Sequence, residues 1–386
     1  MILILKVVFG ISAFLVVHTY LIYPLLIKFI SLFFKKDKVL TSCNQKVSVL
    51  LSAFNEEKVI KERIENIAKL DCDFDNIEVL IGSDNSTDKT NQIISEMSLQ
   101  FKWLKPFLFE KRRGKALVLN DLVAKASNDI LVFTDANTFF KKDALKTLIS
   151  YFNKEDIGGV SGRLQLIESE MIEKGVKEKN YWDYEIFIKK SEGRCGILIG
   201  ANGGIFAIKR NLYKKIPADK PVTDDLFISL NVINKDFKFL YANESIAIEE
   251  VGQKIIHEFK RKIRFSATNF QTLVLYKSLL FNKNLLLSFS FWSHKVIRWM
   301  TPLLLIVAFL SSMFLFIWAD EFRVIFFAQV LFYGLSVIGY ILDKKGVSIS
   351  LFSIPFYFSL ANIAILIGLK NFLMKKHSIV WDSTPR

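Results

Sequence analysis

The chain has 386 residues, 51% of them hydrophobic, and a mean hydropathy of +0.30. This composition excludes an ordinary soluble enzyme and leaves room for one large domain, or two smaller ones, beside membrane helices. The formal net charge is +14, but no nucleic-acid-binding motif accompanies it. We therefore expect membrane lipid, and no nucleic acid, as the partner of the basic residues.

Residues 1–34 are predicted to form an N-terminal transmembrane helix. Residues 7–29 are almost wholly apolar, and a helix needs ~20 such residues to cross a bilayer. Lys35, Lys36 and Lys38 follow at once, and such clusters mark the cytoplasmic side of a membrane. We therefore expect a multi-pass protein of the cell membrane (plasma or inner) whose next domain is cytoplasmic.

Residues 45–250 have the pattern of an α/β domain. A helical pattern with Ile60, Ile64 and Ile67 on one face separates two short apolar runs, and further helical patterns follow. The apolar, β-rich runs are residues 47–51, 77–81 and 130–133. Strands that alternate with helices predict βαβ units and a parallel sheet, in which ligands bind beyond the carboxyl ends of the strands.

Polar motifs follow the first and second runs. Asn55 and Glu57 end the first run and open the first helix, where they either cap that helix or grip a base or a ribose. Asp84 lies just past the second run, where it either belongs to a solvated turn or accepts a hydrogen bond from a nucleobase. These residues alone leave both alternatives open.

Two further motifs suit a diphosphate and a metal ion. Arg112-Arg113-Gly114-Lys115 places cations beside a glycine, which suits a diphosphate but also describes a basic surface loop. It is not a P-loop, because the upstream glycine and the Ser or Thr after the lysine are missing. Asp135 and Asn137 have the spacing for two oxygens on one side of an extended segment, so they could hold a metal that bridges a diphosphate.

Asp224 and Asp225 precede an apolar helical run. One of them could cap that helix, and the other could act as a general base, provided that it reaches an acceptor hydroxyl. The sequence contains no GxSxG, GxGxxG or HExxH motif, so hydrolase triads, dinucleotide binding and zinc proteases lose support.

The C-terminal part is predicted to be associated with the membrane. Residues 251–299 are expected to form amphipathic interfacial helices, residues 300–370 transmembrane helices and residues 371–386 a basic tail. One span before the α/β domain and three after it would put the C-terminus outside, whereas the lysines of the tail favour the inside. A re-entrant segment interrupted by Pro355 would resolve this conflict, which the sequence leaves open.

The order of these motifs resembles that of the family 2 glycosyltransferases, in particular membrane-embedded members related to cellulose, hyaluronan and poly-N-acetylglucosamine synthases. The resemblance covers residues 46–265, and the segments 293–299 and 381–386 also look like bacterial exopolysaccharide members. It implies a GT-A fold, which is Rossmann-like, and inverting transfer from a UDP-sugar to a growing polysaccharide or a lipid-linked acceptor. It also implies Mg²⁺ or Mn²⁺ as cofactor.

The resemblance implies roles for individual residues. Asp225 matches the general base, Asp224 replaces the glutamate beside it, and Asp135 with Asn137 matches the metal-binding DxD. Residues implied to bind the nucleotide sugar are Ala53, Asn55, Glu57, Asp84, Lys115, Asp135, Asn202 and Gly203. Residues that correspond to the QxxRW element, near acceptor and diphosphate, are Arg261, Arg264 and Phe265.

Two departures from the family pattern leave alternatives open. Asn137 is neutral where many members have aspartate, and the family's Gln and Trp have become Arg261 and Phe265, which gives a weaker aromatic platform for an acceptor sugar. The alternatives are a single-addition transferase acting on polyprenyl phosphate and a catalytically inactive partner subunit. A transporter would carry charged residues inside its spans, and the three C-terminal apolar segments 301–318, 324–342 and 347–369 contain none.

Overall fold

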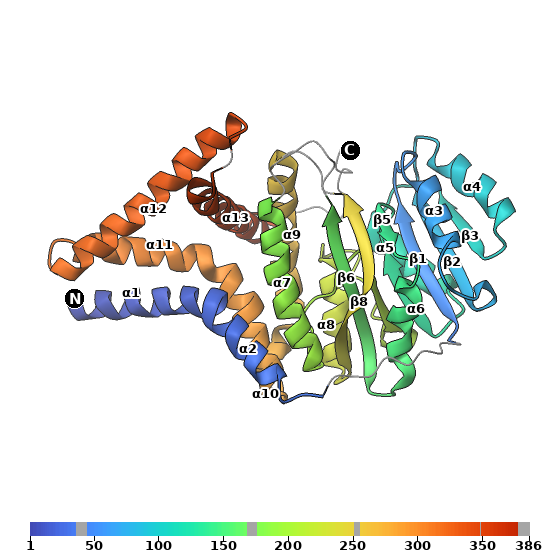
Figure 1. The fold of residues 1–386 in the computed structure, drawn as a ribbon, viewed down its shortest axis with the longest axis horizontal. Helices are drawn as coiled ribbons and strands as arrows, with labels where there is room; N and C mark the ends of the chain where they lie inside the picture. The colour runs from blue at the N-terminus through green and yellow to red at the C-terminus, as the bar shows by residue number, and fades with distance from the viewer. Residues whose placement is uncertain (36–44, 168–175, 251–254, 348, 377–386) are drawn as a thin grey trace.

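The computed structural model describes residues 1–35, 45–167, 176–250, 255–347 and 349–376. It has two parts, an α/β domain and a group of long apolar helices, with helices α7 (Val176–Arg194) and α9 (Ile255–Leu275) between the sheet and that group (Figure 1). The expected segment 381–386 lies outside the described residues.

One mixed sheet forms the centre of the α/β domain. Its order is β3-β2-β1-β4-β7-β6-β8-β5. The strands are β1 (Val47–Ala53), β2 (Ile77–Asp84), β3 (Leu104–Phe109), β4 (Ile130–Thr134), β5 (Thr138–Phe140), β6 (Ile157–Ile167), β7 (Phe206–Lys209) and β8 (Lys238–Glu250). The three predicted strands are confirmed as β1, β2 and β4, which pair in parallel with one another and with β3.

The predicted parallel sheet is confirmed for β1 to β4, whereas the second half of the sheet is mixed, with β6 and β8 parallel to each other. Strand β7 runs antiparallel to β4 and β6, and β5 runs antiparallel to β8. The reversal follows the segment 200–204, where Gly200 adopts a φ of +93° that residues with a side chain rarely take. The chain reaches β7 through α7, and β7 then pairs antiparallel with both β4 and β6, so the sheet is mixed.

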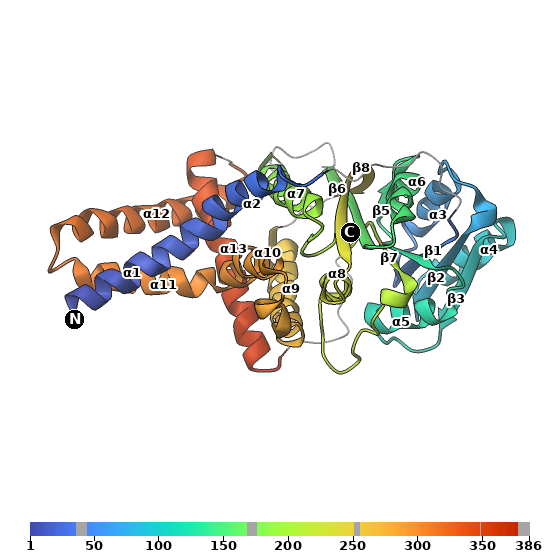
Figure 2. The ribbon, with the colours of Figure 1, turned by 90° about the horizontal axis from the view of Figure 1, so that it is seen from below.

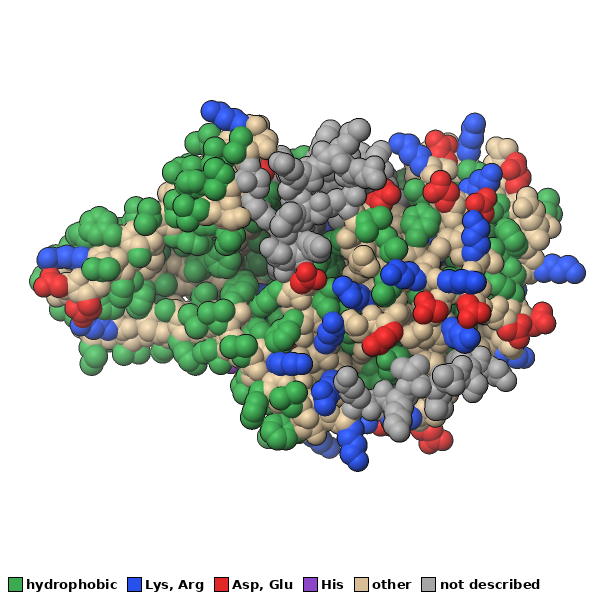
Figure 3. Space-filling view, viewed as in Figure 1, with side chains coloured by type: hydrophobic (Ala, Val, Ile, Leu, Met, Phe, Trp, Pro, Cys, Tyr) green, Lys and Arg blue, Asp and Glu red, His purple; other side chains and the backbone are tan. Residues whose placement is uncertain are grey.

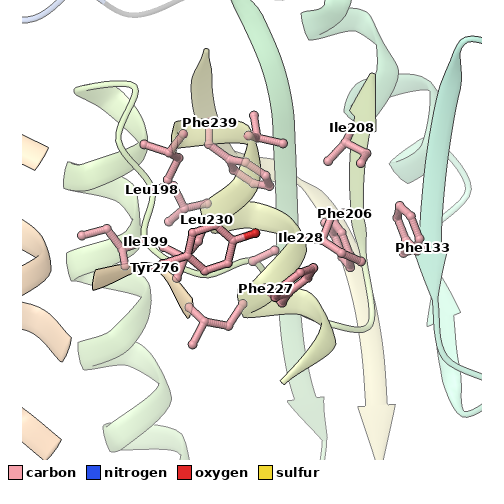
Figure 4. Close-up of a cluster of buried hydrophobic side chains, with 14 of the residues drawn as sticks. Phe133, Leu198, Ile199, Phe206, Ile208, Phe227, Ile228, Leu230, Phe239 and Tyr276 are labelled. Carbon is pink, nitrogen blue, oxygen red and sulfur yellow. The ribbon is translucent and has the colours of Figure 1, made fainter. Parts of the chain in front are cut away.

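Helices cover both faces of the sheet. One face packs on α3 (Ile60–Ala68), α4 (Thr90–Gln100) and α6 (Ala144–Ile149); the other packs on α5 (Lys115–Lys125) and α8 (Asp224–Asn234). On the second face, Phe133 of β4 and Phe206 of β7 stack with ring centroids 4.7 Å apart (Figure 4). This core continues to Tyr23 and Phe291 of the apolar helices, so it joins the two parts of the molecule.

Four helical segments are long and apolar enough to cross a membrane. They are Ile2–Ser31 (α1 Ile2–Val17, a π-helical turn and α2 Tyr23–Ser31), Leu285–Leu315 (α10 Leu285–Phe291, a π-helical turn Trp292–Val296 and α11 Ile297–Leu315), α12 (Asp320–Lys344) and α13 (Ser350–Leu373). Figure 3 shows hydrophobic side chains covering this half of the molecule and charged side chains over the α/β domain.

Residues 285–299 do not form the separate interfacial helix expected from the sequence, because they continue into α11 as one helix. Their polar side chains Ser290, Ser293 and His294 are fully buried in the protein, which explains how a segment with polar residues becomes part of an apolar helix. Helix α9 occupies most of the expected amphipathic stretch. Of its apolar residues, Phe270 is buried, whereas Ile256 and Val274 are exposed.

Helix α13 runs across the direction of α1 and α11 (Figure 2). It packs on α9, where Phe372 stacks on Phe270 with ring centroids 6.0 Å apart. Gly368 allows this approach, because a Cβ there would lie 2.4 Å from Cβ of Ser266. Pro355 lies inside α13 without ending it.

Candidate active site

The polar motifs meet at the carboxyl ends of β1, β2 and β4. The segments after these strands carry Asn55 and Glu57, then Asp84, then Asp135 and Asn137. Parallel strands place these ends at one edge of the sheet, in the position where ligands bind to open α/β sheets.

The first two segments are held together by hydrogen bonds. The side-chain oxygen of Asn55 accepts from Thr87 N at 2.8 Å, and Glu57 accepts from Lys89 N at 3.1 Å. Asn55 has a φ of +54°, a conformation that Asn adopts more readily than most residues. Ala53 is buried at the end of β1, and the Arg112 guanidinium stacks over Phe54 at 3.6 Å from the ring centroid.

Asp84 is buried and holds the loop that precedes Lys115. It is 3% exposed, and its two carboxylate oxygens accept from the backbone N–H groups of Arg113 and Gly114 at 2.8 and 2.7 Å. This carboxylate therefore fixes the loop that carries Lys115. Gly114 has a φ of +89°, which explains why a glycine stands before the lysine.

Lys115 connects two carboxylates from different segments. Its Nζ lies 2.8 Å from Oδ1 of Asp135 and 2.9 Å from Oδ2 of Asp224. Burial alone would lower the pKa of Lys115, but the two carboxylates outweigh it and raise that pKa. The same lysine lowers the pKa of Asp224 against the effect of burial. The ion pairs bring the motif after β4 and the start of α8 to one point.

Asp225 is the carboxylate with the properties of a base. Burial and the neighbouring Asp224 raise its pKa to about 6. Its Oδ1 accepts from Leu226 N at 2.6 Å, and its Oδ2 has no hydrogen-bond partner within the described residues. Gly203 makes room for it, since a Cβ on Gly203 would lie 3.1 Å from Oδ2 of Asp225. A general base with a pKa near the working pH and a free oxygen suits proton transfer from a hydroxyl.

Asp135 and Asn137 offer oxygens that a hard divalent cation prefers. Asn137 donates to Oε1 of Glu249 at 3.0 Å. In the described part of the chain, the amide oxygen of Asn137 and Oδ2 of Asp135 have no hydrogen-bond partner. The described residues hold no group of three His, Cys, Asp or Glu that could bind a metal. The two free oxygens of Asp135 and Asn137 could serve as ligands for such a cation.

Asn202 is fixed by three buried contacts. Its backbone N–H donates to Oγ of Ser161 at 2.9 Å, its side-chain nitrogen donates to Gly162 O at 2.6 Å, and its side-chain oxygen accepts from Nζ of Lys189. These contacts hold the segment 200–204 beside Asp225.

The three residues at the QxxRW position lie on α9. Arg261 pairs with Glu258 at 2.6 Å, and Phe265 is 38% exposed. The Arg264 guanidinium lies 5.1 Å from the ring centroid of Phe265. Burial and Arg261 lower the pKa of Arg264, and Asp224 opposes them. Arg264 thus lies within electrostatic reach of Asp224.

The sequence analysis missed Arg63 of α3. Its guanidinium is fully buried, donates to Oγ1 of Thr134 at 2.9 Å and stacks over Phe140. Burial lowers its pKa to about 9, and Asp135 opposes that shift. A signal was present, because Arg63 lies three residues after Ile60, on the apolar face of the helix.

A second polar cluster, also missed, joins α7 to the apolar helices. Glu192 accepts from the Tyr23 hydroxyl at 2.7 Å, lies 2.6 Å from Nδ1 of His294 and accepts from Ile199 N at 3.1 Å. Arg298 forms an ion pair with Glu185. The family resemblance at residues 293–299 pointed to this cluster, because His294 and Arg298 belong to that segment.

Residues 48–217 match the family model described as Glycosyl transferase family 2. They form a family 2 glycosyltransferase domain. The fold is the GT-A fold: the solved structure of a mannosyltransferase from Pyrobaculum calidifontis, in complex with GDP-Man and Mn²⁺, superposes with a TM-score of 0.76. At 18% identity it covers 96% of this chain and 100% of its own, so the likeness includes the apolar helices.

Two curated relatives of this glycosyltransferase domain differ in the products that their names give. The chain is 25% identical over 234 residues to a poly-beta-1,6-N-acetyl-D-glucosamine synthase of Staphylococcus epidermidis, covering 59% of this chain and 55% of the relative. It is 33% identical over 123 residues to a beta-monoglucosyldiacylglycerol synthase of Synechocystis sp., covering 30% and 25%. The chain thus spans about half the length of the first relative and a quarter of the second.

Proposed function

We propose that the protein is an inverting, membrane-bound glycosyltransferase that moves one sugar from a nucleoside-diphosphate sugar to the hydroxyl of an acceptor at the membrane. One observation carries the proposal. Asp225, with its raised pKa and free oxygen, lies beside the ion pairs of Lys115 with Asp135 and Asp224 at the carboxyl edge of the sheet. Lys295, from a helix that could cross a membrane, lies close to Gly200 of the segment that contacts Asp225.

In this proposal each group has one task. Asp225 accepts the proton of the attacking hydroxyl, which bonds to the anomeric carbon while the nucleoside diphosphate leaves from the opposite face. Lys115 neutralises charge that develops on the diphosphate, and Arg264 adds to the positive potential. Asp135 and Asn137 would hold Mg²⁺ or Mn²⁺, which supplies further charge neutralisation on the leaving group. No covalent intermediate on the enzyme is required.

UDP is the proposed nucleotide, as the motif resemblance implies, and cell-surface polysaccharide or glycolipid synthesis is the proposed context. The names of the relatives support both kinds of product. The Pyrobaculum structure contains GDP-Man, so the donor panel must include GDP-sugars as well as UDP-sugars. The GT domain is proposed to face the cytoplasm, since lysines follow the first apolar helix.

The test is nucleotide release by the protein purified in nanodiscs. Each donor is offered with Mg²⁺, Mn²⁺ or EDTA and a membrane extract as acceptor. We expect release with one donor, dependence on the metal, and a fall of about 10²-fold or more in Asp225→Asn, as expected when a general base is lost. Asp219→Asn, at an exposed carboxylate five residues before α8, is the matched control and should keep wild-type activity.

Three outcomes would decide against parts of the proposal. Near-normal transfer by Asp225→Asn would remove this residue as the base. Metal-independent release would remove the role of Asp135 and Asn137. No release with any donor and extract, from a folded sample, would favour an inactive partner subunit. Product size separates a polymer synthase from a single-addition enzyme.

A further inference from the structure

Two lysines lie beside the segment 200–204, which also contacts the proposed base Asp225. Lys189 of α7 donates to the side chain of Asn202. Nζ of Lys295, from the π-helical turn Trp292–Val296, lies 3.8 Å from the position that a Cβ on Gly200 would occupy. Asp225 approaches the same segment at Gly203, and its charge acts on both lysines. The lysines and the base thus meet at one short segment.

Neither lysine has a carboxylate partner within the described residues. Lys189 is 8% exposed, and its partner is an amide oxygen. Nζ of Lys295 lies 3.4 Å from Nε2 of His294. The nearby carboxylates are engaged elsewhere, Glu185 with Arg298 and Glu192 with Tyr23 and His294.

Buried ammonium groups normally have an anionic partner, because desolvation of an unpaired charge is costly. Burial and Lys295 lower the pKa of Lys189 to about 8, so Lys189 still carries its charge at neutral pH. Each ammonium has three donors, and the contacts above use one of them. This pair therefore has the charge and the free donors that a phosphate group requires.

The position of the pair indicates which substrate brings the phosphate. The donor diphosphate is assigned to Lys115 and the carboxyl edge, beyond Asp225. Lys295 belongs to a helix that could cross a membrane, and Lys189 to α7, which lies between that group of helices and the sheet (Figure 1). The two lysines therefore lie between the group of apolar helices and the segment beside Asp225, the side from which a lipid-borne acceptor would approach.

We propose that Lys189 and Lys295 bind a phosphate group of the acceptor, so that the acceptor is a lipid-linked phosphate or diphosphate and not a neutral glycan or neutral lipid. The inference rests on the proposed function, because it concerns the acceptor of that reaction.

The test measures binding without any nucleotide sugar. Farnesyl phosphate and its uncharged alcohol, farnesol, are titrated into the protein in detergent. We expect the phosphate to bind at least about tenfold more tightly than the alcohol, a ratio that corresponds to about 1.4 kcal/mol. Lys189→Met and Lys295→Met should each abolish this preference, and Lys295→Arg should keep it.

Lys190→Met is the matched control, because Lys190 follows Lys189 on the same helix and is exposed. It should bind both probes as the wild type does. Inorganic phosphate and phosphatidylglycerol vesicles are then tested as competitors of farnesyl phosphate. Competition by either supports the site and shows whether a free anion or a phospholipid headgroup can bind there. If Lys189→Met does not fold, Lys295→Met decides, since Lys295 is only partly buried.

Equal affinity for phosphate and alcohol, or an equal loss in Lys190→Met, would overturn the inference. The two proposals fail separately, since loss of nucleotide release in the wild type argues against the transferase while leaving farnesyl phosphate binding intact. Conversely, both lysine variants could transfer sugar to a neutral acceptor at the wild-type rate. That result would support the transferase proposal and contradict the phosphate site.

Discussion

At the scale of single residues, the ionic contacts of Lys115 give adjacent carboxylates different properties. Asp224 is paired with Lys115 and remains ionised, whereas Asp225 has no such partner and carries a raised pKa. The sequence alone offered helix capping or catalysis for the pair without deciding between the two aspartates. The two aspartates are distinguished only by the ion pair of Asp224 with Lys115, which lies 109 residues earlier in the sequence.

The raised pKa of Asp225 predicts the pH dependence of transfer. A general base works in its unprotonated form, and Asp225 loses its proton as the pH rises through about 6. The rate should therefore be high above that value and should fall about tenfold per pH unit well below it. A single-turnover pH profile checks this, and a flat profile between pH 5 and 7, a range on the order of one unit either side of the pKa, would contradict it.

Asp224→Asn provides a second test of the same pair. It removes the like charge that helps to raise the pKa of Asp225, so the acidic limb of the profile should move to lower pH. The turnover number should also fall, because Lys115 loses one of its partners. The shift of the limb is the diagnostic result, since a merely structural effect would lower the rate without moving it.

At the scale of helices and strands, the predicted strands are those with continuous apolar runs. The longer strands β6 and β8 were not predicted, because glycines or polar residues interrupt their apolar residues. The continuous runs of β1, β2 and β4 are buried on both faces and were recognised. Strands β5 and β7 have three and four residues, too few for a period to be read. Helix α7 was also missed, because its buried residues include Glu185, Lys189 and Glu192, whose partners lie far away in the sequence.

Close contact between α12 and α13 depends on Gly339. A Cβ there would lie 2.3 Å from the backbone oxygen of Phe352, so Gly339→Leu must push the helices apart. We expect a loss of about 1–3 kcal/mol of stability, as for other overpacked sites, seen as a lower thermal midpoint in detergent. Gly334→Leu is the control on the same helix, since nothing lies within 4 Å of its Cβ position. Equal loss in both variants would contradict the packing argument.

At the scale of the whole molecule, the orientation of α13 bears on the topology that the sequence left open. Because α13 crosses the direction of α1 and α11 and packs on α9 (Figure 2), we expect it to lie along the membrane surface. Three spans would then remain, Ile2–Ser31, Leu285–Leu315 and α12, with the α/β domain and the C-terminus on the same side. This arrangement agrees with the lysines near the C-terminus.

Reporter fusions in a bacterial host test this topology. Green fluorescent protein fused after Lys376 should fluoresce, because it folds in the cytoplasm. Alkaline phosphatase fused after Ala319, between α11 and α12, should be active, because it folds outside. Alkaline phosphatase activity at the C-terminus would show instead that α13 crosses the membrane.

The contacts of Glu192 have a consequence for the length of the acceptor. One carboxylate joins Tyr23 of the first apolar helix, His294 of the second and the segment that leads to Gly203 and Asp225. We therefore expect the base to stay at a constant distance from the lipid, because these contacts oppose a pivoting of the α/β domain on the apolar helices. Among acceptors with the same reactive hydroxyl, we expect the enzyme to select those in which that hydroxyl lies at one particular distance from the lipid.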